Sequence, residues 1–217
     1  MDRSRILAHR GLYSSDSEKN SAIALQRAID NGFGIETDLR DLNGRIVISH
    51  DPPLQSSDPL PFEWLLQLLR HNPGNARIAL NIKADGLCSH INSLIAHSKI
   101  DSNTIFFFDM SIPDTLSYIK HNSPIYSRIS EHEGIPAFLS AAQGVWVDNF
   151  SGGYPQVEKA QELIDKGFRV TLVSPELHKR EHHRLWDEIH DSEIYLSELF
   201  ELCTDLPHDA ARKFCVS

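Results

Sequence analysis

Apolar and polar positions follow two different periods along this chain. Strand-like apolar runs occur at 5–9, 34–39, 77–83, 104–109, 124–130, 144–149, 167–174 and 200–205. Between them, apolar residues recur with helical spacing, which predicts helices at 21–32, 61–72, 88–99, 113–121, 157–166 and 178–190. Strands that alternate with helices are typical of a parallel α/β sheet.

The number of these units predicts the architecture. About eight strand–helix units in 217 residues predict a small (β/α)₈ TIM barrel, formed as a single domain over residues 1–217. A doubly wound open sheet is the alternative. The first predicted strand is not followed by a GxGxxG turn, which argues against a dinucleotide-binding sheet.

Net charge, apolar content and cysteine number restrict which binding partners and which cellular location we expect for this protein. A formal net charge of -9 argues against a nucleic-acid or anionic-membrane partner. No apolar run reaches the roughly 20 residues of a membrane-spanning helix, and the charged N-terminal sequence does not resemble a signal peptide. Three scattered cysteines predict no disulfide framework, so we expect a reducing, cytoplasmic location.

Polar residues gather where the predicted strands end, which is where a barrel places its active groups. Glu36 and Asp38 are two apart on one strand, so both carboxylates point to the same face. They repel each other unless a cation lies between them, one is protonated, or both pair with Arg or Lys. Other polar strand ends are His9, Arg10, Asn81, Lys83, Asp109, Arg128, Asp148, Asn149, Ser174, Thr204 and Asp205.

A predicted hairpin follows the paired carboxylates. Asn43 and Gly44 predict a tight turn, and the return strand is expected to end in His50. His9 also ends a predicted strand, so two histidines flank the Glu36–Asp38 strand in the sequence. A single histidine at a strand end is more often structural, but two beside paired carboxylates favour a functional site.

Four segments resemble the glycerophosphodiester phosphodiesterase family, within the phospholipase C-like phosphodiesterase TIM-barrel superfamily. They are ILAHRGLY, EKNS, GIETDLRDLNGRIVISHD and CTDLP. The family pattern has His-Arg-Gly after the first strand, Glu-Asn-Ser/Thr, a Glu-x-Asp strand, His-Asp, and a closing Thr-Asp-x-Pro. The second segment is one residue longer here. The resemblance is strong over 5–52, fair over 77–86, and topological elsewhere.

The resemblance implies a metal-dependent phosphodiesterase that acts on a glycerophosphodiester or a related small-molecule or lipid-derived phosphodiester. It implies one divalent cation, Mg²⁺ or Ca²⁺. The residues that match the family motifs are His9 and His50 as the acid/base pair, Arg10 and Lys83 as phosphate-binding cations, and Glu36, Asp38 and Asn81 as metal ligands.

Two departures from the family pattern affect these expectations. Asn81 stands where the family has Glu, which removes one negative charge but keeps an oxygen ligand suited to Mg²⁺ or Ca²⁺. The connection after His50 is short, with only a minimal insertion, so we expect a more open pocket and a bulkier substrate.

Two other functions remain as alternatives. One is a catalytically silent barrel that binds a phosphorylated ligand, with Asn81 as the lesion. The other is a metal hydrolase of the amidohydrolase kind, although those barrels open with His-x-His and this chain has His-Arg. The four histidines of the predicted helix at 178–190 are interpreted as part of a solvated, charged face rather than a metal site.

Overall fold

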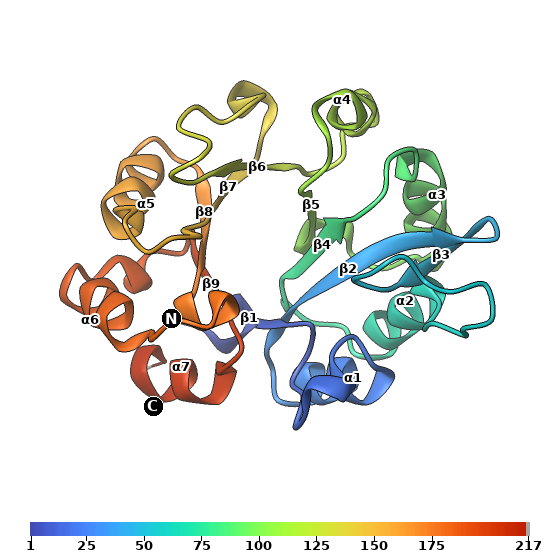
Figure 1. Cartoon of the computed structure of the whole chain (residues 1–217), viewed down its shortest axis with the longest axis horizontal. Coiled ribbons are helices and arrows are strands. Elements are labelled where there is room, and N and C mark those ends of the chain that lie inside the picture. The colour runs from blue at the N-terminus through green and yellow to red at the C-terminus, as the bar shows by residue number, and fades with distance from the viewer. Residues whose placement is uncertain (216–217) are drawn as a thin grey trace.

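A computed structural model of the chain describes residues 1–215 and forms a nearly closed barrel of eight parallel strands (Figure 1). The order around the barrel is β5-β4-β2-β1-β9-β8-β7-β6. The strands are β1 (Ile6–His9), β2 (Gly34–Leu42), β4 (Ile78–Ile82), β5 (Ile105–Phe108), β6 (Tyr126–Ile129), β7 (Gly144–Val147), β8 (Arg169–Val173) and β9 (Phe200–Thr204).

The ring closes between β5 and β6 through a single bridge. Phe107 pairs with Ile125, and the Phe107 backbone N–H donates to the Pro124 carbonyl at 2.8 Å. Inside the barrel, the ring of Phe106 stacks on that of Tyr126, with centroids 3.8 Å apart. Aromatic packing in the interior therefore holds a seam that has few backbone hydrogen bonds.

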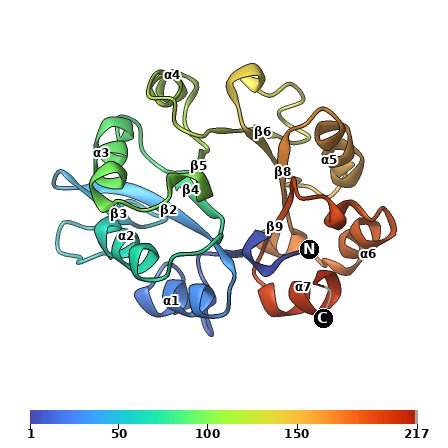
Figure 2. The ribbon, with the colours of Figure 1, turned by 180° about the vertical axis from the view of Figure 1, so that it is seen from behind.

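Helices surround the barrel, as the views from both sides show (Figures 1 and 2). Residues 1–215 contain seven α-helices: α1 (Ala22–Asp30), α2 (Phe62–His71), α3 (Cys88–Ser98), α4 (Ile112–Lys120), α5 (Gln156–Asp165), α6 (His183–Asp191) and α7 (Pro207–Phe214). A loop with one 3₁₀ turn, Leu139–Ala141, takes the place of a helix between β6 and β7. None of the helices in the described part of the chain is long and apolar enough to cross a membrane.

The amino end of the barrel is plugged by a buried polar cluster. Glu201 on β9 is fully buried and accepts hydrogen bonds from Arg77 Nε at 2.7 Å and Thr171 Oγ1 at 2.7 Å. Tyr126 donates to the same carboxylate at 3.3 Å. Since a buried carboxylate is tolerated when its oxygens are paired, this cluster can fill the interior. Ligand access is therefore left to the opposite end, where the strands terminate.

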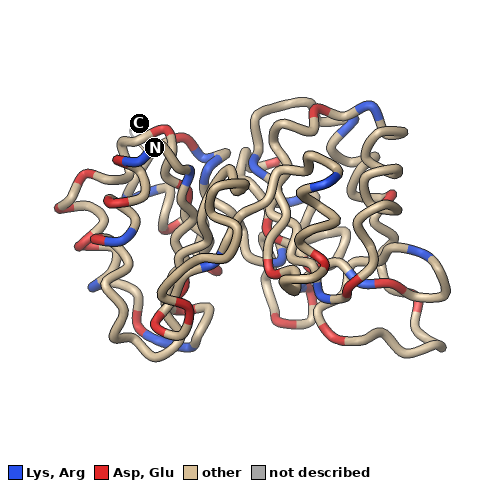
Figure 3. The backbone as a smooth tube through the Cα atoms, turned by 90° about the horizontal axis from the view of Figure 1, so that it is seen from above, with Lys and Arg blue, Asp and Glu red and all other residues tan. Residues whose placement is uncertain are grey.

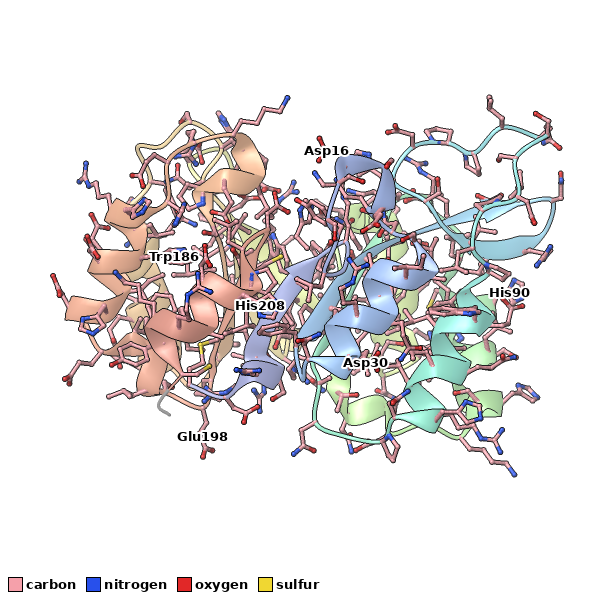
Figure 4. The ribbon with its side chains drawn as sticks, turned by 90° about the horizontal axis from the view of Figure 1, so that it is seen from below. Asp16, Asp30, His90, Trp186, Glu198 and His208 are labelled. Atoms are coloured by element: carbon pink, nitrogen blue, oxygen red, sulfur yellow. The ribbon has the colours of Figure 1, made fainter. Side chains whose placement is uncertain are left out.

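The two ends of the barrel can be located from single residues. Figure 4 shows Asp16, in the loop after β1, and Glu198, just before β9, at opposite ends. Asp16 thus marks the end formed by the carboxyl termini of the strands, which we call the mouth. Acidic and basic positions are interspersed around the outside of the barrel (Figure 3).

The predicted TIM barrel is confirmed, and most predicted elements lie within a few residues of those found. The helix predicted at 178–190 is wrong in its first half. Pro175–His178 form a 3₁₀ turn, η5, and Lys179 has a left-handed backbone with φ of 58°, so α6 begins only at His183. The final helix, α7, was not predicted.

The hairpin after β2 forms as expected but ends earlier. Asn43 and Gly44 have φ values of 52° and 77°, which suit the tight turn, and β3 (Arg45–Ile48) pairs antiparallel with β2. Figure 1 shows this hairpin projecting outside the ring of strands. His50 lies two residues beyond β3. The Ser49 backbone N–H donates to the Asp38 carbonyl at 3.0 Å, so the chain returns to the level of Asp38.

Candidate active site

Strand register aligns the polar residues at the mouth. His9 on β1 is the register partner of Glu36 on β2, and Asp38 is the partner of Asn81 on β4. Ile35 and Leu39 alternate with the carboxylates and are buried in the cluster between barrel and helices. The expected alternation is therefore present, with Glu36 and Asp38 turned into the barrel.

Asp38 is fully buried and lies among donors. Arg10 Nε is 3.2 Å from Asp38 Oδ2, and Lys83 Nζ is 3.4 Å from Asp38 Oδ1. The Asn20 side-chain amide donates to Oδ2 at 2.9 Å. Pairing with Arg and Lys, one of the alternatives from the sequence, thus holds for Asp38. Asn20 was not selected as a site residue, although it is the asparagine of the EKNS segment.

The loop between β1 and α1 places Arg10 and Asn20. Arg10, Gly11 and Asn20 have positive φ values of 56°, 89° and 60°. A Cβ on Gly11 would lie 2.7 Å from the backbone carbon of Ala24, so a side chain does not fit there. The Arg10 backbone N–H donates to the Glu36 carbonyl at 2.9 Å, which fixes the start of the loop against β2.

Glu36 has a different environment from Asp38. It is 2 % exposed, His9 Nε2 lies 3.9 Å from its Oε2, and the Arg10 backbone N–H donates to the same oxygen at 3.3 Å. Burial, together with the adjacent Asp38 carboxylate, raises the pKa of Glu36 to about 7. In the absence of a cation, ionising Glu36 near neutral pH is therefore costly.

Two further oxygens at this point lack hydrogen bonds. Asn81 Oδ1 is buried and accepts no hydrogen bond from any residue in 1–215, and Asp38 Oδ1 has only the Lys83 ammonium nearby, 3.4 Å away, without hydrogen-bond geometry. Together with Glu36 they offer two carboxylates and one amide oxygen from adjacent strands. Oxygen donors of this type are the ligands of Mg²⁺ and Ca²⁺. The Asn81 oxygen without a hydrogen bond, the incompletely satisfied Asp38 oxygen and the raised Glu36 pKa all fit a hard divalent cation among these three residues.

His9 is oriented by a carboxylate from the segment after β9. Its Nδ1 lies 2.7 Å from Asp205 Oδ1, leaving Nε2 toward Glu36. Burial opposes ionisation of Asp205, but the hydrogen bond and charge of His9 outweigh it, so the Asp205 pKa is below its ordinary value. Glu176 in η5 accepts from the Asp205 backbone N–H at 3.1 Å and from the Thr204 hydroxyl. These contacts fix the Nδ1 edge of the His9 imidazole.

His50 is more exposed than His9. Its Nδ1 lies 2.8 Å from Asp51 Oδ1, and Asp51 itself is largely exposed. His50 lines a groove of about 560 Å³ together with Arg10, Lys19 and Asn20. The groove runs between the β1–α1 loop and the short β3–α2 connection. It brings His50 and Arg10 to one surface at the rim of the mouth.

The other half of the mouth has its own charged residues. Arg128 Nη1 lies 2.8 Å from Asp109 Oδ1, and Arg128 Nε donates to Glu133 at 2.5 Å. Burial raises the pKa of Asp109 despite the Arg128 charge. Trp146 stacks on Phe108 inside the barrel at 4.0 Å, which agrees with the prediction that it is a core residue.

Glu181, His182 and His183 form a separate cluster at the start of α6. Their donor atoms lie within 4.8 Å of one another, but Glu181 and His183 are exposed and already hydrogen-bonded to each other. Exposed polar side chains with partners do not require an ion. The cluster is consistent with the solvated surface predicted from the sequence.

Three solved structures resemble the whole chain. A protein assigned as a glycerophosphodiester phosphodiesterase from Galdieria sulphuraria matches with a TM-score of 0.74 and 17% identity, covering 98% of each chain. The chain shares its fold with glycerophosphodiester phosphodiesterases. The enzyme from Agrobacterium tumefaciens matches with a TM-score of 0.66 and 14% identity, over 94% of this chain and 96% of that chain.

The third resembling structure is the glycerophosphodiester phosphodiesterase from Thermotoga maritima. It matches with a TM-score of 0.59 and 17% identity, over 96% of this chain and 97% of that chain. No protein-family model and no curated protein matches the sequence. At such low identities the structural likeness establishes the barrel and its topology. The roles of individual residues rest on the geometry of the mouth.

Proposed function

We propose that the protein is a metal-dependent phosphodiesterase of the glycerophosphodiester phosphodiesterase type. The observation that carries the proposal is the oxygen cluster of Glu36, Asp38 and Asn81, which lies beside one imidazole and two cationic side chains. The shared fold supports the same reaction class. A bound Mg²⁺ or Ca²⁺ would act as a Lewis acid toward a non-bridging phosphate oxygen.

Arg10 and Lys83 supply the remaining positive charge for the phosphate. Both now lie against Asp38, at 3.2 Å and 3.4 Å. With Asp38 serving as a cation ligand, Arg10 and Lys83 would bind the non-bridging oxygens, where charge develops during the reaction. Because Arg10 also lines the groove with His50, we propose that the phosphate binds where the mouth meets that groove.

His9 and His50 are proposed as the acid/base pair. The Asp205 contact holds His9 with Nδ1–H donating, so the Nε2 lone pair is free to accept a proton from the nucleophile. His50, as imidazolium, would donate a proton to the departing oxygen. The nucleophile is a water molecule or a hydroxyl of the substrate itself. The first gives direct hydrolysis, and the second gives a cyclic phosphate that is hydrolysed afterwards.

The short β3–α2 connection supports a substrate wider than a simple glycerol diester. The groove beside His50 is open, and its lining combines Lys19 and Asp16 with the exposed edge of the connection. A lipid-derived phosphodiester fits an open groove of this kind. We therefore place the bulkier alcohol group of the substrate in the groove.

The experiment is hydrolysis of bis(p-nitrophenyl) phosphate and of a glycerophosphodiester by purified protein with Mg²⁺ or Ca²⁺. Turnover that EDTA abolishes, and that His9→Ala removes without a change in thermal unfolding or cation binding, supports the proposal. Cation binding without turnover on a broad panel of phosphodiesters would instead support the silent barrel.

A further inference from the structure

Glu176 holds the backbone of the residue whose carboxylate orients His9. It is the second residue of η5, the 3₁₀ turn that follows β8, and its Oε1 accepts from the Asp205 backbone N–H at 3.1 Å. The same oxygen accepts from the Thr204 hydroxyl. That hydroxyl in turn accepts from the Leu206 backbone N–H at 2.9 Å. One glutamate oxygen and one hydroxyl therefore hold the backbone on both sides of Asp205.

The other carboxylate oxygen of Glu176 is tied to the barrel and to helix α6. Ser174 donates from its hydroxyl to Glu176 Oε2, and the Trp186 indole N–H donates to the Ser174 oxygen at 2.8 Å. Ser174 and Thr204 are fully buried, and Trp186 is 3 % exposed. Because these groups are shielded from water, each depends on its protein partner for hydrogen bonding. The network therefore fixes the Glu176 carboxylate, which can in turn fix the turn at Asp205.

The position of Asp205 is set by this turn rather than by the strand. Asp205 comes directly after the last residue of β9, and its backbone N–H is donated to the Glu176 side chain. Its own carboxylate lies 2.7 Å from His9 Nδ1. A displacement of about 1 Å at a catalytic group can cost about a hundredfold in rate. The orientation of His9 thus depends on how firmly the Asp205 turn is held.

We propose that Glu176 is a positioning residue for the general base: it fixes the turn at Asp205, and Asp205 then holds the Nδ1 edge of His9. The proposal rests on the proposed function, because His9 is the general base of that reaction. Glu176 acts through Asp205, so its effect on kcat requires the Asp205 carboxylate. This requirement distinguishes positioning from a general contribution to stability.

The test is a double-mutant cycle on the hydrolysis of bis(p-nitrophenyl) phosphate with Mg²⁺ or Ca²⁺. It compares the wild type, Glu176→Ala, Asp205→Ala and the double variant. We expect Glu176→Ala to lower kcat by about three- to tenfold with little change in KM, within the range of couplings inside one hydrogen-bond network. In the Asp205→Ala background the same substitution should lower kcat by less than about twofold, because no carboxylate is left to position.

Three further variants complete the test. Glu176→Gln can still accept from Thr204 and from the Asp205 backbone N–H while its amide donates to Ser174, so its kcat should stay within about twofold of the wild type. Glu158→Ala, at an exposed position of α5, is the matched control and should leave kcat and KM unchanged. Ser174→Ala removes one hydrogen bond of Glu176 and covers the case in which Glu176→Ala does not fold. It should lower kcat in the wild type and not in Asp205→Ala.

The outcomes separate the two proposals, with thermal unfolding used to show that each variant is folded. No turnover by the wild-type protein contradicts the proposed function, and the role of Glu176 falls with it. Unchanged turnover in Glu176→Ala, a loss of equal size with and without the Asp205 carboxylate, or a Glu176→Gln variant as slow as Glu176→Ala overturns the role of Glu176 alone. A loss in kcat that Glu176→Gln restores and that is confined to proteins with Asp205 confirms it.

Discussion

Glu36→Gln should change how the stability of the metal-free protein depends on pH. The pKa of Glu36 is about 7 in the folded protein, against an ordinary value of 4.5. Between these values the folded state binds more protons than the unfolded state, so the free energy of unfolding falls as pH rises. At about 1.4 kcal/mol per pH unit, the free energy of unfolding falls by about 3 kcal/mol in total between these two pKa values. The fall is complete just above pH 7. The amide side chain of the variant does not titrate, so this loss should disappear.

The assay is urea unfolding of EDTA-treated protein at pH 5 and at pH 8, for the wild type and for Glu36→Gln. Other titrating groups contribute to both proteins, so the quantity to compare is the difference between their pH responses. Glu198→Gln, at the exposed closed end of the barrel in Figure 4, is the control and should respond as the wild type does. Added Mg²⁺ or Ca²⁺ should restore stability at pH 8 in the wild type and much less in Glu36→Gln.

One result would refute this reasoning about Glu36. If the wild type and Glu36→Gln lose the same free energy of unfolding between pH 5 and pH 8, then ionisation of Glu36 is not costly in the fold. The paired carboxylates would in that case need no cation, and the neighbouring cationic side chains would be sufficient.

The remaining predictions concern the metal ligand, the imidazole support and the barrel interior. Asn81→Asp should bind Mg²⁺ or Ca²⁺ at least as tightly as the wild type in calorimetry, because it adds a negative charge; weaker binding would show that Asn81 is not a ligand. Asp205→Ala should lower kcat about tenfold or more with little change in KM, because His9 loses its orientation; steady-state kinetics with unchanged rates would contradict this. Arg77→Met should lower stability in urea unfolding by about 2–3 kcal/mol, since the buried Glu201 carboxylate loses its shortest charged hydrogen bond and keeps Thr171, Tyr126 and the more distant Arg169; a loss below about 1 kcal/mol would contradict the pairing.

Local patterns in the sequence were sufficient for the barrel and for the paired carboxylates. Alternation with period two places Glu36 and Asp38 inside whenever Ile35 and Leu39 are outside, and the parallel pairing of β1, β2 and β4 then brings His9 and Asn81 beside them. These are consequences of strand geometry. They do not depend on contacts between distant loops.

Other site residues depend on long-range contacts that no local pattern encodes. Asn20 reaches Asp38 because the β1–α1 loop uses left-handed backbone at Arg10 and at Asn20 itself. Glu176 belongs to the 3₁₀ turn η5, which the left-handed backbone at Lys179 separates from α6. Its contact with Thr204 spans 28 residues of sequence.

The seam between β5 and β6 could not be predicted either. Both segments have ordinary strand patterns, yet they share one bridge, and the loop after β6 contains no α-helix. How well two neighbouring strands pair depends on the twist and packing of the whole barrel. The stacked pair of Phe106 and Tyr126 at this seam is visible only in three dimensions.

The most direct test of the central claim is a titration of EDTA-treated protein with Mg²⁺ or Ca²⁺ while hydrolysis of bis(p-nitrophenyl) phosphate is followed. The account predicts no turnover without cation, a saturable increase as cation is added, and no increase in Asp38→Asn. Full turnover in EDTA, or a saturable increase that survives in Asp38→Asn, would contradict it.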